Sequence, residues 1–132
     1  MDLFQKITKL EKAAESFGLK WQNSEQIIQQ ILSEVEEVQE HLIHSDEKSV
    51  PSFDLEEELG DLLHAVLALC VYCKLPPEQV LDKTLTKFSK RLNSVKKIAN
   101  DMGFNALNTL SFEEQMAIWD QAKELAHNVS LK

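Results

Sequence analysis

The chain has 132 residues, 43% of them hydrophobic, which suits one domain with a single core. Three glycines and three prolines are too few for a turn-rich all-β protein, whereas abundant Leu, Glu, Gln, Lys and Ala favour helices. A formal net charge of −8 disfavours nucleic acid and anionic membranes as partners and makes divalent cations natural counter-ions. No apolar run reaches the roughly 18 residues that span a bilayer, and the opening residues resemble no secretion signal, so we expect a cytoplasmic protein.

The spacing of apolar residues predicts two helices in the first third of the chain. Apolar positions recur at helical spacing over residues 4–17, and Gly18 ends that pattern. Ser24 is the predicted N-cap of a long second helix whose apolar positions run over residues 27–42. Residues 45–53 are predicted to form a polar loop.

A third and a fourth helix follow this loop. Asp54 and Glu57 form a variant of the capping box that opens the third helix, which is nearly apolar over residues 59–75. Pro76–Pro77 stops this helix and starts the fourth, whose apolar residues keep a near-heptad spacing over residues 81–98. Two consecutive helices joined by a short turn are therefore expected.

The remaining residues predict one more helix. Gly103 is the predicted stop of the fourth helix, and residues 104–110 are predicted to form a loop. Ser111–Glu114 is a capping box that opens a last helix with apolar positions over residues 116–126. We therefore expect an all-α bundle of about five helices, with residues 1–132 in one domain.

Acidic residues of the second helix divide into two groups when residues are placed about 100° apart around the helix axis. Glu36 and Glu40 fall on the solvated side. Glu34 and Glu37 lie at the edge of the apolar stripe, one turn apart, so they can share a ligand.

The third helix carries a second acidic pair. Glu58 falls inside the apolar stripe, and Asp61 flanks it one turn later. A carboxylate among apolar residues needs a cation or a proton, because removing its charge from water is costly. If both pairs converge, their mutual repulsion favours a divalent cation, and an all-oxygen group suits Mg²⁺ or Mn²⁺. The alternative is a set of surface acids or ion pairs that binds no metal.

Five segments resemble motifs of the MazG-type nucleoside triphosphate pyrophosphohydrolases, in the same order. Ser33–Glu37 and Glu57–Leu63 are similar to the E-E-x-x-E and E-x-x-D motifs of that family. Phe17–Trp21, Lys87–Arg91 and the stretch from Leu110 to Lys123 resemble its G-F-x-W, K-F-x-R-R and closing L-S-x-E-E motifs. The resemblance covers nearly the whole chain.

This resemblance implies an all-α NTP pyrophosphatase bundle that dimerises or forms a higher homo-oligomer. It implies Mg²⁺-dependent cleavage of a nucleoside triphosphate between its α and β phosphates, which releases a nucleoside monophosphate and pyrophosphate. By resemblance, the metal ligands would be Glu34, Glu37, Glu58 and Asp61. Glu37, before Glu34, is the preferred residue to take the proton of the attacking water.

Lys83, Lys87, Lys90 and Arg91 lie on one flank of the fourth helix. On helix geometry alone they could be a solvated basic face. The resemblance implies that Lys87 and Arg91, with Lys90 beside them, contact the β and γ phosphates, where Lys offers a point charge and Arg a bidentate fork. Trp119 could be either a core residue or a base-stacking platform.

Two positions depart from the family pattern. Ser33 stands where the first Glu of E-E-x-x-E is expected, and Gln30 where related chains often carry Lys. Activity could be reduced, or the preferred substrate changed. Trp21 is assigned to packing, and His41 and His64 to helix surfaces.

Two alternative functions therefore stay open. One is a narrower pyrophosphohydrolase acting on dUTP, dCTP or a phosphoribosyl-nucleotide. The other is a catalytically silent, metal-stabilised helical partner protein.

Overall fold

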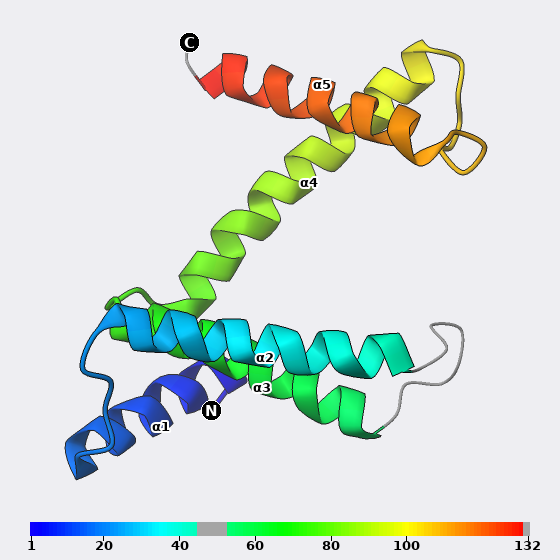
Figure 1. The fold of residues 1–132 in the computed structure, drawn as a ribbon. Coiled ribbons are helices and arrows are strands. Elements are labelled where there is room, and N and C mark those ends of the chain that lie inside the picture. The colour runs from blue at the N-terminus through cyan, green and yellow to red at the C-terminus, as the bar shows by residue number, and fades with distance from the viewer. Residues whose placement is uncertain (45–52, 131–132) are drawn as a thin grey trace. The chain divides into compact units, whose positions relative to one another are not determined.

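The structure is a computed structural model that describes residues 1–44 and 53–130 (Figure 1). These residues form helices and connecting turns without a strand, so the predicted all-α class is confirmed. The predicted loop at 45–53 lies outside the described residues except for its last residue, which begins a helix. The helices are α1 (Leu3–Phe17), α2 (Ser24–His44), α3 (Phe53–Tyr72), α4 (Pro77–Asp101) and α5 (Phe112–Ser130).

Helix α1 has a capping residue at each end, Asp2 and Gly18. The Asp2 carboxylate accepts a hydrogen bond from the backbone N–H of Gln5, and the Gln5 side chain accepts one from the Asp2 backbone N–H. Gly18 has a φ of 108°, and its N–H donates to the carbonyls of Ala14 and Glu15. A residue with a Cβ rarely adopts this left-handed conformation, so the stop predicted at Gly18 is confirmed with its physical reason.

Two predicted N-caps were wrong. The N-cap of α2 is Asn23, whose side-chain oxygen accepts the N–H of Gln26 at 3.0 Å, while Ser24 is already the first helical residue. Helix α3 begins at Phe53, so Asp54 lies within its first turn and not at its N-cap. There its charge still favours the positive end of the helix dipole.

The chain divides into two compact units, residues 1–80 and 81–132, and the boundary falls in the first turn of α4. In the N-terminal unit, α3 packs against both α1 and α2. The unit's buried apolar residues come mainly from α2 and α3, and they are Ile27, Val38, Leu55, Ala65 and Ala68. Whether residues 1–132 act as one domain stays a prediction.

The C-terminal unit has its own core between α4 and α5. Val95, Ile118 and Ala122 are buried together, and Trp119 is among the partly buried residues packed against them. Helix α4 ends at Asp101, three residues beyond the predicted end of its apolar pattern, and Gly103 follows it with a φ of 90°. No single helix of the described residues is both long and apolar enough to span a membrane.

Candidate metal centre

Helices α2 and α3 bring three carboxylates together. One oxygen each from Glu34, Glu58 and Asp61 can be chosen so that all three lie within 4.8 Å of one another. Glu34 comes from α2, and the other two lie one turn apart on α3, so the close packing of these helices creates the group (Figure 1). Glu34 and Glu58 are half-buried, and Asp61 is exposed. We call these three residues the acid group.

Glu37 stands outside the acid group. Its side chain is exposed one turn after Glu34, and its oxygens are not among those within 4.8 Å. Its charge still acts on Glu58. The sequence therefore grouped four acids, of which the structure brings three into close reach and keeps one nearby.

The electrostatics of Glu58 reflect this crowding. Its side chain is 22% exposed. Burial raises the pKa of the Glu58 carboxyl, and the charges of Glu37, Asp61 and Glu34 raise it further. His41 opposes this rise in pKa; its Nε2 lies 3.8 Å from the nearer Glu58 oxygen. An ionised Glu58 is therefore unfavourable unless a positive charge approaches.

Gln30 orients one member of the acid group. Its side-chain nitrogen donates a hydrogen bond of 2.7 Å to Glu34. An amide that holds a carboxylate oxygen limits the rotation of that carboxylate and leaves its other oxygen available to a ligand. Gln30, which the sequence placed on the same flank of the helix as Glu34 and marked as a departure from the family pattern, is thus a neighbour of the site.

A cavity of about 650 Å³ opens beside the acid group. Glu34 and Asp61 line it, so acids and cavity form one site. Trp21, which was assigned to packing, is 36% exposed and also lines it. The other lining residues come from α1, α2, α3 and the link before α2, and they are Leu10, Glu11, Ala14, Leu19, Lys20, Gln30, His64, Ala65 and Ala68.

One hydrogen bond crosses this cavity wall from α1 to α3. His64 Nε2 and a Glu11 carboxylate oxygen are 2.7 Å apart. Both residues line the cavity, with 62% of the His64 side chain and 21% of the Glu11 side chain exposed. Sequence reasoning placed His64 on the helix surface and did not consider Glu11, because nothing local links residues 53 positions apart.

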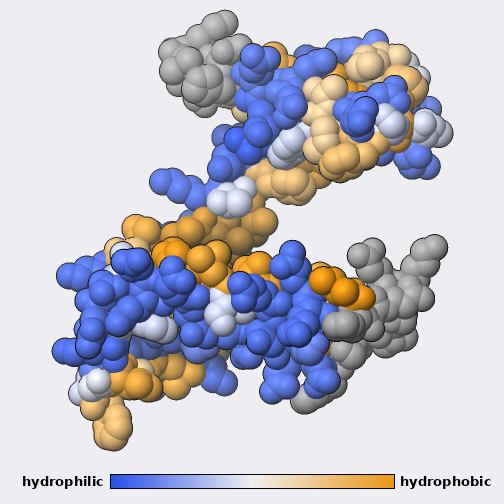
Figure 2. All heavy atoms as spheres, in the orientation of Figure 1, coloured by the Kyte–Doolittle hydropathy of each residue, from blue (hydrophilic) through white to orange (hydrophobic). Residues whose placement is uncertain are grey.

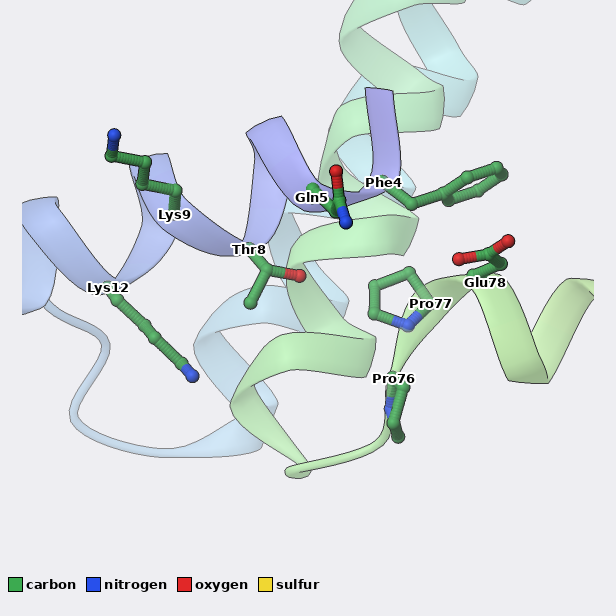
Figure 3. A pocket seen from close by; sticks show the side chains of 8 residues that line it. All are labelled: Phe4, Gln5, Thr8, Lys9, Lys12, Pro76, Pro77 and Glu78. Carbon is green, nitrogen blue, oxygen red and sulfur yellow. The ribbon is translucent and has the colours of Figure 1, made fainter. Parts of the chain in front are cut away.

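A second cavity, of about 460 Å³, lies between α1 and the turn that begins α4 (Figure 3). Phe4 and Thr8 line it on one side and Pro76 and Pro77 on the other. It contains no member of the acid group, and its one carboxylate belongs to Glu78. The chemistry of a metal centre therefore belongs to the larger cavity.

The predicted substrate-binding residues lie in the C-terminal unit. Lys87 and Lys90 are exposed on α4. Arg91 is half-buried, with its Cζ 5.9 Å from the centre of the Trp119 ring, and the Phe88 ring lies 5.9 Å from the same ring at 48°. Among the described residues, the buried Arg91 Nε has no hydrogen-bond partner. The contacts of these residues with phosphates stay predictions.

Comparison with known proteins identifies the family. The MazG nucleotide pyrophosphohydrolase domain matches residues 22–96, a segment that contains the acid group, Glu37 and all three predicted basic residues. The Thermotoga maritima protein named nucleoside triphosphate pyrophosphohydrolase/pyrophosphatase MazG is 28% identical over 115 residues, which cover 87% of this chain and 42% of that protein.

Further relatives agree with this match. A nucleoside triphosphate pyrophosphohydrolase of Escherichia coli K12 is 27% identical over 115 residues, with the same two shares. The uncharacterized protein YabN of Bacillus subtilis is 32% identical over 71 residues, which cover 54% of this chain and 14% of that protein. The chain thus spans less than half the length of these curated relatives. Because the domain match covers more than half of the chain, the chain belongs to the MazG nucleotide pyrophosphohydrolase domain family.

Proposed function

We propose that this protein hydrolyses nucleoside triphosphates to a nucleoside monophosphate and pyrophosphate, with Mg²⁺ as its metal and Mn²⁺ as a substitute. The observation that carries the proposal is the acid group, Glu34, Glu58 and Asp61, at the edge of a cavity. Membership of the MazG domain family and the names of two relatives support the same reaction.

The donor set fits such an ion. All donors of the acid group are carboxylate oxygens, which are the hard ligands that Mg²⁺ and Mn²⁺ take in proteins. The raised pKa of Glu58 comes from burial and crowded negative charge, and a divalent cation would relieve this repulsion. When bound, the metal would neutralise phosphate charge and lower the pKa of a water molecule.

The chain's own residues would then have separate tasks. Glu34, Glu58 and Asp61 would hold the metal, and the hydrogen bond from Gln30 would fix the orientation of Glu34. Glu37, close enough to raise the pKa of Glu58 but outside the acid group, would take the proton of the attacking water. The water oxygen would bond to the α phosphorus while the bond from that phosphorus to the bridging oxygen breaks, and pyrophosphate would leave. Glu34 is the alternative base.

The cavity beside the acids is the proposed place of the nucleoside. Its volume of about 650 Å³ is of the size that small-ligand pockets have, roughly 300–1,000 Å³. Apolar walls with an exposed tryptophan can receive a base, and the acids at the edge would put the phosphates next to the metal. Trp21 therefore has a proposed role in substrate binding.

Lys87, Lys90 and Arg91 remain the proposed phosphate contacts, because a triphosphate needs cationic partners and this chain is strongly acidic. The unsatisfied Arg91 Nε offers a donor for such a contact.

Trp119 lies against the C-terminal core and against both Phe88 and Arg91. These contacts favour packing over base stacking for Trp119.

Self-association is a further part of the proposal. Large apolar side chains are exposed on α3 and α4, and Figure 2 shows apolar patches on the surface. Leu63 is 63% exposed and Leu85 is 53% exposed in the single chain. Such surface favours a homodimer or higher homo-oligomer, in which another copy would cover it. Light scattering that finds only monomers at all concentrations would contradict this part.

The reaction can be tested by incubating the purified protein with Mg²⁺ and a panel of nucleoside triphosphates and identifying the products by chromatography. Monophosphate with pyrophosphate is the expected result, and chelation of the metal should stop it. Diphosphate with phosphate, or no turnover of any nucleotide, would overturn the proposal. Stabilisation by Mg²⁺ without turnover would instead indicate the catalytically silent partner protein.

A further inference from the structure

Glu11 and His64 are hydrogen-bonded to each other and form a polar part of the cavity wall. The two atoms are 2.7 Å apart, and both side chains line the cavity that Glu34 and Asp61 also line. An ionised carboxylate can only accept hydrogen bonds, so the proton between the two residues belongs to His64 Nε2. In the neutral tautomer that carries this proton on Nε2, the Nδ1 atom has no proton and accepts hydrogen bonds.

In this tautomer the pair presents acceptors and no donor to a molecule in the cavity. These acceptors are the second oxygen of Glu11 and the Nδ1 of His64. Of the other donors among the lining residues, the amide nitrogen of Gln30 donates to Glu34, and the indole N–H of Trp21 and the ammonium of Lys20 are the further ones. Acceptors in a partly buried wall favour a ligand that brings N–H groups to them.

Nucleobases differ in the donors that they can bring. Adenine, cytosine and guanine each carry an exocyclic amino group with two N–H donors, whereas uracil and thymine carry a single N–H between two carbonyl oxygens. Those carbonyls would face the acceptors of Glu11 and His64 without a hydrogen between them. Repulsion of this kind is a strong source of discrimination, because it leaves polar groups of the site unpaired.

We propose that the Glu11 and His64 pair selects nucleoside triphosphates whose base carries an exocyclic amino group and rejects uracil and thymine. This inference rests on the proposed function and names the substrate class of the same site. It also separates two of the narrower enzymes considered from the sequence, since it favours dCTP over dUTP.

A purely structural role for the pair is the competing explanation, because the hydrogen bond also ties α1 to α3. Glu11→Gln separates the two roles. The amide oxygen of Gln can still accept the proton of His64 and hold the helices together, while its NH₂ group replaces an acceptor by a donor. A structural clamp would survive this change, and the base preference would not.

The test measures kcat/KM for two matched pairs of substrates, CTP against UTP and GTP against ITP, which lacks the amino group of GTP. In the unaltered protein we expect CTP and GTP to be preferred by roughly 10- to 100-fold, the range that one hydrogen bond to a charged group supplies. Glu11→Gln should bring both ratios close to one, through a rise in KM for CTP and GTP. Glu11→Asp, which keeps the carboxylate, should retain part of the preference.

Two control variants sharpen this test. Glu15→Gln changes an exposed carboxylate one turn further along α1 that lines no described cavity, and it should alter neither ratio. Lys20→Met removes the charged donor that also lines the cavity. If the preference disappears in Lys20→Met and persists in Glu11→Gln, the assignment to Glu11 and His64 is wrong.

A binding measurement keeps this inference separate from the reaction itself. Calorimetry with Mg²⁺ and the α,β-methylene analogues of CTP and UTP reports base preference without turnover. Equal affinities in the unaltered protein would overturn the inference even if hydrolysis occurs. A preference for the CTP analogue that Glu11→Gln removes would support it even if hydrolysis fails. Absence of binding to either analogue, together with absence of turnover, would overturn both proposals.

Discussion

Glu58 on α3 and Glu114 on α5 are two carboxylates of one chain whose pKa values shift in opposite directions. At Glu114, the backbone N–H and the side chain of Ser111 lower the pKa of the carboxyl, in that order of size. At Glu58, burial and three neighbouring acids raise the pKa. The first carboxylate has local donors that stabilise its charge, and the second has mainly acids around it.

This difference shows what each acid contributes. Glu114 belongs to a reciprocal capping box in which Ser111 Oγ also accepts the N–H of Glu114 at 3.1 Å, so its charge stabilises the start of α5. The raised pKa of Glu58 means that its ionised form is less favourable in the folded chain than in the unfolded chain, and a bound cation would offset this difference. An acid that costs stability is therefore a better candidate for function than an acid that a helix end explains.

The largest expected effect is at Glu58 itself. Glu58→Gln keeps the size of the side chain and removes its charge, so repulsion among the acids falls and the metal loses a ligand. Turnover should fall by more than the roughly 10- to 100-fold that loss of a supporting group near a metal costs. Stabilisation by Mg²⁺ should also disappear, as measured by thermal unfolding with and without the ion.

The matched control for Glu58 is Glu36→Gln, which changes an exposed acid on α2. It should leave both turnover and the Mg²⁺ effect unchanged. If Glu58→Gln is folded and as active as the unaltered protein, Glu58 is not a metal ligand and the contrast with Glu114 has no functional meaning.

A smaller effect is expected at Gln30. Gln30→Ala removes the donor that holds the Glu34 carboxylate and leaves all members of the acid group in place. The concentration of Mg²⁺ needed for half-maximal activity should rise by roughly 10- to 100-fold, because the ligand is no longer fixed in orientation. Gln29→Ala, an exposed neighbour on the same helix, should show no such rise.

The pH dependence of the free energy of unfolding gives a third test, with a smaller expected effect. A carboxyl whose pKa is raised on folding contributes stability that is fully present below its ordinary value of 4.5 and is lost as the pH rises through the folded value. Without metal, the contribution of Glu58 should therefore decline between acid and neutral pH. Saturating Mg²⁺ should abolish this decline, because a bound cation favours the ionised carboxylate in the folded chain. In Glu58→Gln both the decline and the effect of Mg²⁺ on it should be reduced.

Features of the fold could be predicted from the sequence where they depend on residues that are close together in the chain. Gly18 and the Ser111–Glu114 box act within a few residues, so their patterns predicted helix ends that the structure confirms. The α2 cap failed because Asn23 and Ser24 are adjacent residues of equal capping ability, and only the geometry selects Asn23.

The site was predictable where helix periodicity controls it. Periodicity separated Glu34 from the solvated Glu36 and placed Glu58 inside the apolar stripe of its helix. The raised pKa of Glu58 agrees with that position. The pair of Glu11 and His64 was not predictable, since it depends on how α1 lies against α3. The cavity has the same origin, because three helices and a link must meet to form it.

The smallest expected effect concerns the carboxylate that has its own donors. Ser111→Ala removes the side-chain partner of the capping box, and the free energy of unfolding should fall by about 1 kcal/mol, as loss of an N-cap residue typically costs. The pKa of Glu114 is lowered on folding, so its contribution is present above 4.5 and is lost as the pH falls through the folded value. The variant should therefore show a smaller loss of stability on acidification than the unaltered protein, as measured by denaturant unfolding across that range. Ser89→Ala, at an exposed position inside α4, should lower the free energy of unfolding at no pH, because Ala favours a helix interior more than Ser does. Equal destabilisation by both variants would mean that the loss at Ser111 does not come from its hydrogen bond with Glu114, and the contrast between Glu114 and Glu58 would lose its basis.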